Sequence, residues 1–296
     1  MSGAAKSLES LDVADPALPG DAPETPPQGL APRAGALTVA FWKGRGGLAL
    51  VSLSLILGGW WGVTAAGWIA PLFLPSPGDV VRQLIKASTV GYMDATLLEH
   101  AKASVTRIVL AAAAAAAVGI PIGLLMGTNR TVRGLLDPLI EIYRPIPPLA
   151  YLPLIVIWFG IGETSKVLVI FLAILAPIVV STAHGTGNAG SDRIRAAQSL
   201  GATRWQLLRH VVLPGALPDI LTGLRIGLGA GWSTLVAAEL VAATQGLGFM
   251  VQSASQFLAT DVVIAGILVI AAIAFSVELV LRAVQRRLSP WHGLSD

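Results

Sequence analysis

The sequence predicts an all-α protein that crosses a membrane with about six helices. The 296 residues are 54% hydrophobic and only 12% charged, with a mean hydropathy of +0.72. Soluble domains of this size carry about 25% charged residues, so much of this surface faces lipid. Six segments approach the roughly 20 apolar residues that a membrane crossing needs. The 32 glycines and 19 prolines are also typical of membrane helices.

The six predicted spans follow one another with mostly short connections. Only the last two carry a charge, at Glu239 and Glu278, and four prolines interrupt the third. A further amphipathic helix is expected at 76–87, because Ser76 can cap it and Pro77 suits its first position. The predicted spans are residues 48–68, 108–127, 145–161, 167–183, 226–243 and 262–281.

Four regions are expected along the chain. Residues 1–45 have no apolar periodicity and predict a disordered cytoplasmic tail. They do not resemble a cleaved signal peptide, since the first long apolar run starts near Leu48. Residues 46–97 are expected to hold the first transmembrane helix and a periplasmic segment. Residues 98–285 then form the transmembrane core, and residues 286–296 a cytoplasmic tail.

The distribution of Lys and Arg predicts the orientation of the chain. With the amino terminus in the cytoplasm, 13 of the 20 basic residues lie inside and five outside, with Arg144 and Arg225 near inner helix ends. Basic residues concentrate on the cytoplasmic side of membrane proteins. Both termini and the connection 184–220 are therefore predicted to be cytoplasmic.

Catalytic and metal sites are not expected within this chain. There is no Cys, and the four His residues are too scattered for a metal site. No paired Asp or Ser/His set lies within the helices. Residues 160–166 superficially resemble a phosphate-binding loop, but Ser165 stands where a Gly must precede Lys166. The chain is therefore expected to bind no ATP itself.

The connection 184–220 carries the most specific pattern. A glycine-rich run at 185–190, expected to be flexible, precedes Ser191 and Asp192, which can cap a short helix. Gly201 suits the left-handed position that ends this helix. Thr203 can cap a second helix, which Pro214 is expected to stop. Two short helices that meet at a glycine turn are thus predicted to project into the cytoplasm.

This pattern resembles the EAA signature of ABC importer permeases. The signature reads Glu-Ala-Ala, three residues, Gly, nine residues, Ile, any residue and Leu-Pro. The chain departs from it at the first position, where Arg replaces Glu. The resemblance implies a type I ABC permease fold whose coupling helix docks on a separate ATPase. The residues implied in this coupling are Arg195, Ala196, Ala197, Gly201, Ala202, Leu213 and Pro214.

The resemblance extends from about Leu74 to Gly293 and is strongest to the nitrate, sulfonate and taurine subfamily. The stretches 143–153, 158–166, 195–202, 231–239 and 286–293 resemble it, and the last three are most similar to taurine permeases. This implies a homodimer of permeases, two copies of an ATPase that binds ATP and Mg, and a periplasmic substrate-binding protein. The resemblance also implies a location in a bacterial inner membrane, where membrane lipid would surround the complex, and no nucleic-acid partner is expected.

Six residues are candidates for the translocation path. Glu239 is an acid within an apolar run, although its position near a helix end also fits a polar helix terminus. The proline-rich stretch can line a pore or form a kink packed between helices. Hydroxyl and aromatic groups suit passage of taurine, yet Ser and Thr commonly serve helix packing. The candidates are Tyr143, Tyr151, Trp232, Ser233, Thr234 and Glu239.

Other substrates and another transport class remain open. Aliphatic sulfonate, nitrate or a pyrimidine precursor fits the same architecture. A secondary transporter is disfavoured, because coupled proton carriers need acids or His at mid-membrane, and the predicted helix centres hold almost none.

Overall fold

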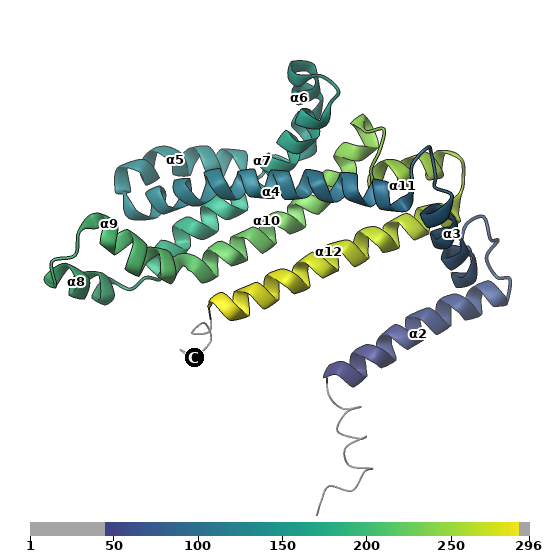
Figure 1. The fold of residues 1–296 in the computed structure, drawn as a ribbon, viewed down its shortest axis with the longest axis horizontal. Helices are drawn as coiled ribbons and strands as arrows, with labels where there is room; N and C mark the ends of the chain where they lie inside the picture. The colour runs from purple at the N-terminus through teal and green to yellow at the C-terminus, as the bar shows by residue number, and fades with distance from the viewer. Residues whose placement is uncertain (1–44, 290–296) are drawn as a thin grey trace, which may run out of the picture. The chain divides into compact units, whose positions relative to one another are not determined.

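The computed structural model describes residues 45–289. The predicted amino-terminal tail, except Arg45, and most of the predicted carboxyl-terminal tail lie outside the described residues. The chain divides into two compact units, one that ends at Leu57 and one that begins at Gly58. Helix α2 (Arg45–Ala65) starts in the first unit and ends in the second. The remaining elements belong to the second unit (Figure 1).

The described elements after α2 are helical throughout. In chain order they are α3 (Pro77–Thr89), α4 (Leu97–Thr128), α5 (Arg130–Tyr143), the 3₁₀ turn η1 (Pro148–Tyr151), α6 (Leu152–Phe159), α7 (Glu163–Gly187), α8 (Ser191–Ser199), α9 (Arg204–Leu207), the π-helical turn η2 (Leu208–Val212), α10 (Leu213–Ala242), α11 (Leu247–Gln256) and α12 (Thr260–Leu288). Within residues 45–289, the named elements are thus helices, as the long apolar segments of the sequence predict.

Five helices within the described residues are long and apolar enough to cross a membrane, and a bent pair can supply a sixth. This pair joins α5 to η1 and α6 with a bend of 86°. The prediction of about six spans is confirmed. The third span is nevertheless not one straight helix, because Pro145, Pro147 and Pro148 cannot continue a helical hydrogen-bond ladder.

Helix α3 begins as its sequence predicts. The Ser76 hydroxyl accepts a hydrogen bond from the Asp79 backbone N–H at 3.2 Å, and the Asp79 carboxylate accepts one from the Ser76 N–H. This reciprocal capping box satisfies two donors that a helix start leaves unpaired. The hydrogen bond from the Ser76 hydroxyl also lowers the pKa of Asp79 below its ordinary value.

Helices α4, α7 and α10 pack together through small residues. On α4, Ala111, Ala115 and Gly119 follow at intervals of four, and both alanines are fully buried. They pack in one core cluster with Ile174 and Ile178 of α7. A Cβ atom built on Gly119 would lie 3.0 Å from the Ile178 side chain. Small residues repeated every four positions allow membrane helices to approach closely.

Helix α10 approaches α7 from another side through a second row of glycines. Added Cβ atoms at Gly223, Gly227 and Gly231 would lie 2.6, 3.0 and 2.8 Å from Ser181 or Ile174 of α7. These three glycines therefore permit close contact between the two helices. Gly229 does not take part in this contact, because an added Cβ would meet nothing within 4 Å.

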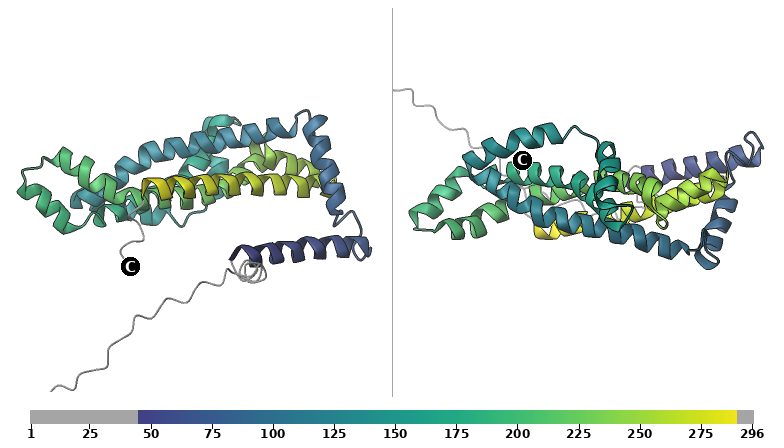
Figure 2. Two further views of the ribbon diagram at one scale, coloured as in Figure 1. Left: turned by 60° about the horizontal axis from the view of Figure 1, so that its bottom comes forward. Right: turned by 90° about the horizontal axis from the view of Figure 1, so that it is seen from above.

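The three long helices have two distinct ends. Helices α8 and α9 lie where α4 and α7 end and α10 begins, and α11 lies at the opposite end (Figures 1 and 2). Helix α12 packs beside α10 and against α11 and α3. Sites near α8 and near α11 are therefore separated by much of the length of the helices.

The long connection predicted at 184–220 is shorter in the structure. Helix α7 continues to Gly187, and Gly185 is buried against Ala216 and Asp219 of α10. The first half of the predicted flexible run, residues 185–187, is therefore helical. Helix α8 also starts directly after Gly190, so Ser191 is its first residue rather than its cap.

Pro214 does not stop the second helix, contrary to the prediction. It lies in the first turn of α10, directly after η2. Proline fits the start of an α-helical segment, because no hydrogen bond from its nitrogen is needed there. The π-helical turn interrupts the regular hydrogen-bond ladder, so α9, η2 and α10 follow one another without a loop.

Candidate functional site

A glycine turn between α8 and α9 forms the tip of the predicted coupling region. Gly201 has a φ of +79°, a conformation that side chains other than glycine rarely adopt. Its N–H donates to the Gln198 carbonyl at 2.9 Å, and the Ala202 N–H donates to the Ala197 carbonyl at 3.1 Å. These two bonds are the Schellman ending of a helix. The left-handed glycine predicted from the sequence is confirmed.

The second half of the tip starts with a cap at Thr203. The Gln206 N–H donates to the Thr203 hydroxyl at 3.3 Å, and the Thr203 N–H donates to the Gln206 side chain at 2.8 Å. The predicted cap at Thr203 is confirmed. Because both helix ends at the turn are satisfied internally, the turn has a defined shape before any partner binds.

The tip presents apolar groups that the chain itself does not cover. Leu200 is 89% exposed and Trp205 is 67% exposed. Ala196 is exposed and Ala197 is half-buried on the preceding helix. Exposed apolar side chains on an ordered turn favour contact with another protein.

The remaining coupling candidates lie behind this tip. Arg195, which replaces the acidic residue of the signature, donates to Asp192 within α8 at 2.7 Å. Ala202 is half-buried at the turn. Leu213 and Pro214 lie at the start of α10, and Leu213 lines an apolar groove of about 590 Å³ beside α4. Leu213 and Pro214 therefore lie where the tip joins the long helices and not on its exposed surface.

The two candidate tyrosines lie together against α7. Their hydroxyl oxygens are 3.2 Å apart, and their ring centroids are separated by 6.3 Å. The Tyr143 hydroxyl donates to the Leu172 carbonyl of α7. Both side chains are half-buried. This arrangement fits a kink packed against a neighbouring helix, the second of the two interpretations.

The three neighbouring candidates on α10 divide between core and surface. Trp232 belongs to the core cluster with α4 and α7 and is 9% exposed. Thr234 is buried, and its hydroxyl donates to the Ala230 carbonyl at 2.9 Å. Both contribute to helix packing. Only Ser233 of the three is exposed in this chain.

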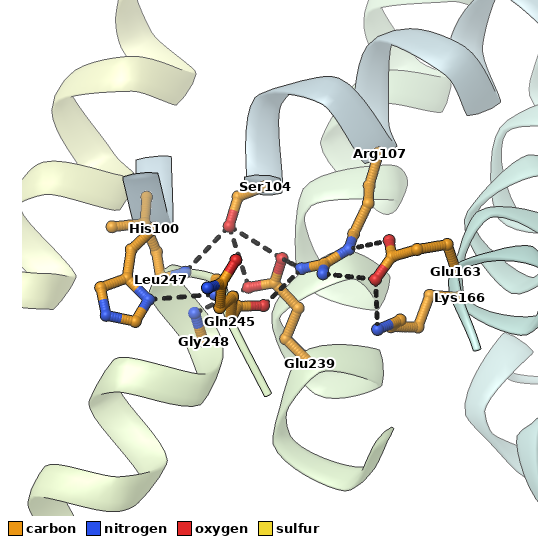
Figure 3. Close-up of polar contacts among 10 residues, drawn as sticks. His100, Ser104, Arg107, Glu163, Lys166, Glu239, Gln245, Leu247 and Gly248 are labelled. Carbon is orange, nitrogen blue, oxygen red and sulfur yellow. Dashed lines mark hydrogen bonds and ion pairs between the residues drawn. The ribbon is translucent and has the colours of Figure 1, made fainter. Parts of the chain in front are cut away.

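Glu239 forms the centre of a buried polar network (Figure 3). Its side chain is fully buried, although Glu239 lies only three residues before the end of α10. Arg107 of α4 donates to its carboxylate at 2.6 Å, the Ser104 hydroxyl at 2.8 Å, and the Gly248 N–H at 2.8 Å. A buried carboxylate needs such partners, because its transfer from water is costly.

Arg107 continues the network to the start of α7. Its guanidinium group donates to both carboxylate oxygens of Glu163, at 2.6 and 2.8 Å. Lys166 contacts the same carboxylate at 2.7 Å. The Glu163 side chain is 63% exposed, whereas that of Arg107 is 5% exposed. The network therefore connects a buried acid to an exposed one at the border of a pocket of about 400 Å³.

The loop before α11 is held by the same face of α4. The Gly246 N–H donates to His100 at 3.1 Å, and the Leu247 N–H donates to Ser104 at 2.9 Å. Arg107 also donates to the Gln245 carbonyl at 2.7 Å. One face of α4 thus binds the start of α7, the end of α10 and the start of α11.

Sequence reasoning identified Glu239 but not its partners. His100, Ser104 and Arg107 are spaced by four and three residues, so they share one helix face. A polar helix face of this kind, together with an acid in an apolar run elsewhere in the chain, was the available signal for a buried polar network. It did not specify the partner, since Glu239 is 132 residues from Arg107 along the chain.

Comparisons with known proteins agree with this architecture. Residues 119–290 match the family model described as binding-protein-dependent transport system inner membrane component. The chain is 64% identical over 247 residues to the taurine transport system permease protein TauC of Escherichia coli K12, covering 83% of this chain and 90% of TauC. It is 32% identical to a putative aliphatic sulfonates transport permease protein, SsuC, of Bacillus subtilis 168, covering 87% and 86%.

A relative with another named substrate and a solved structure extend the comparison. The nitrate import permease protein NrtB of Synechocystis is 35% identical, covering 72% of this chain and 82% of NrtB. A chain of the inward-facing MetNI methionine ABC transporter has the same fold, with a TM-score of 0.59 at 18% identity, covering 65% of this chain and 95% of that one. The chain therefore belongs to the binding-protein-dependent inner membrane components, the multi-pass permease subunits of ABC importers.

Proposed function

We propose that this chain forms the pathway of an ABC importer for taurine or a closely related sulfonate. The 64% identity to TauC over most of both chains supports the substrate. Aliphatic sulfonates and nitrate are the alternatives, since permeases named for them are 32% and 35% identical to this chain. Competition by unlabelled taurine, an alkanesulfonate or nitrate against labelled taurine uptake distinguishes these substrates.

We propose that a separate ATPase docks on α8, Gly201 and α9. The observation that carries this proposal is the exposed, internally capped tip with Leu200 and Trp205 uncovered. Ala196 and Ala197 permit close approach by a partner, and ATP and Mg bind to that partner. Arg195 is paired with Asp192 within α8. The contact is therefore assigned to apolar groups and not to an acidic residue.

The tip is connected to the helical bundle by continuous helix, so its movement is expected to displace α10. The chain passes from α9 through η2 into α10, whose 30 residues span roughly 45 Å at 1.5 Å per residue. The far end of α10 carries Glu239, which Arg107 ties to α4 and, through Glu163, to α7. Displacement of α8 and α9 is thus expected to move three helices as one body.

The complete importer is proposed to contain two copies of this chain, two ATPase subunits and a periplasmic substrate-binding protein. Both termini and α8 then lie in the cytoplasm, and the polar network around Arg107 faces the periplasmic side. Closure of the ATPase pair brings the two tips together and changes the bundle from inward-open to outward-open. Ser233 remains the candidate for the translocation path that is exposed on α10.

Crosslinking tests the docking proposal directly. The chain contains no natural cysteine, so a single cysteine at Leu200 reports only that position. In the assembled complex, a bifunctional maleimide reagent is expected to join this position to a cysteine in the ATPase. A cysteine at Leu98 is the control, because Leu98 is 76% exposed and lies at the start of α4, far from α8. A crosslink to the ATPase from position 98 but not from position 200 contradicts the proposal.

A further inference from the structure

A basic pocket lies between the first half of α10 and the last turns of α12. Arg225, Arg282, Gln285, Arg286 and Ser289 line this cavity of about 440 Å³. The four residues from α12 and its end are spaced by three, one and three positions, so they share one helix face. Arg225 reaches the same pocket from α10, and its guanidinium group donates a hydrogen bond to the Gln285 side chain at 3.1 Å.

Positive charge in this pocket exceeds negative charge. Arg225 and Arg282 both donate to the Glu278 carboxylate, the latter at 2.7 Å. Arg286 forms no ion pair or hydrogen bond through its side chain with any residue between 45 and 289. Three guanidinium groups therefore face one carboxylate, which leaves about two positive charges without a counterion in the described chain.

The Ser289 hydroxyl is the second observation that indicates a ligand. Ser289 is only 4% exposed, and its Oγ atom has no hydrogen-bond partner. A buried hydroxyl without a partner costs free energy. Its position in the lining of the basic pocket provides a donor for a group that enters from outside.

We propose that this pocket binds a phosphate group, and that its source is the headgroup of an anionic lipid. Arginine forks and a hydroxyl are the donors that suit a tetrahedral oxyanion. The pocket is lined by residues from the last turns of α12, and α12 ends at the same end of the bundle as α8 (Figure 2). With the proposed orientation, this is the level of the cytoplasmic headgroups, where basic pockets between helices bind anionic lipids.

The general preference for basic residues on the cytoplasmic side does not account for this arrangement. That preference, like the favourable placement of cations at a helix C-terminus, requires only charges near the helix end. It requires neither a guanidinium contributed by α10 nor a buried hydroxyl without a partner. The pocket combines both with Arg286, whose charge is unpaired in the described residues.

Lipid binding to the intact complex tests the proposal. Native mass spectrometry in detergent measures binding of dioleoylphosphatidylglycerol and of dioleoylphosphatidylcholine to the wild type, Arg286→Gln and Arg287→Gln. Arg287 is exposed but does not line the pocket, so its variant has the same charge change without the site. We expect phosphatidylglycerol to bind about tenfold more weakly to Arg286→Gln only.

Further measurements distinguish the source of the phosphate group. Ser289→Ala is expected to weaken phosphatidylglycerol binding while leaving the thermal stability of the lipid-free complex unchanged or higher. If millimolar inorganic phosphate raises the melting temperature of the wild type but not of Arg286→Gln, while phosphatidylglycerol does not bind, the site takes a free anion. Equal losses in the Arg286 and Arg287 variants, or equal binding of both lipids, overturn the proposal.

Discussion

Arg107 of α4 and Glu239 of α10 form an ion pair at 2.6 Å, with side-chain exposures of 5% and 0%. The pair connects two helices that also contribute to one apolar core cluster, through Ile108 of α4 and Trp232 of α10. Burial makes such a pair different from an exposed one, because removal of one partner leaves an uncompensated charge.

Arg107→Gln is expected to destabilise the permease by about 3–5 kcal/mol. The change leaves the carboxylate of Glu239 buried without its counterion. The measurement is the melting temperature of the purified complex. Arg82→Gln is the control, since the Arg82 side chain is 78% exposed in its pair with Asp79. Adding Glu239→Gln to Arg107→Gln is expected to recover part of the loss; no recovery contradicts the assigned pairing.

Gly227→Leu is expected to disrupt the contact between α10 and α7. An added Cβ at Gly227 lies 3.0 Å from the Ile174 backbone oxygen, which cannot move without shifting α7. Overpacking of this kind costs about 1–3 kcal/mol or more. Gly229→Leu is the matched control on the same helix, because its added Cβ meets nothing within 4 Å. Equal yields and melting temperatures of the two variants would show that the glycine row does not set this packing.

Gly201→Val is expected to abolish substrate-stimulated ATP hydrolysis by the reconstituted complex. A β-branched residue is strained at the φ of +79° found here, so the shape of the tip changes. Gly134→Val is the control, since Gly134 lies in α5 with open space around its Cβ position. Stimulated hydrolysis that persists in the Gly201 variant argues against docking at this turn.

Single cysteines test the proposed orientation without removal of any natural thiol. Gly187→Cys, at the end of α7, is expected to react with an impermeant maleimide only from the cytoplasmic side. Val90→Cys, at a position that is 77% exposed after α3, is expected to react only from the periplasm. Labelling in whole cells and in inverted vesicles measures both, and the reverse pattern overturns the topology.

The sequence predicted those features that depend on local chemistry. The caps at Ser76 and Thr203 and the left-handed Gly201 each follow from residue type and spacing within a few positions. The glycines at 223, 227 and 231 carry a similar local signal, since their interval of four residues places them on one face of α10. Local rules thus predicted about six spans and the left-handed glycine turn between α8 and α9.

Features that depend on how helices continue and pack against one another were not specified by residue type and spacing. Pro214 reads as a stop signal, but η2 places it at the start of a new α-helical segment. Trp232 and Thr234 suit a pathway by chemistry, yet the rotation of α10 turns them into the core. The pairing of Glu239 with Arg107 depends on the packing of α4 against α10, which periodicity alone does not specify.

Uptake of labelled taurine by proteoliposomes tests the central claim most directly. The vesicles contain this chain with its ATPase and are supplied with the substrate-binding protein outside and ATP inside. The account predicts uptake that requires both ATP and the binding protein, and that is lost in Gly201→Val but kept in Gly134→Val. Uptake driven by an ion gradient in the absence of ATP would contradict it.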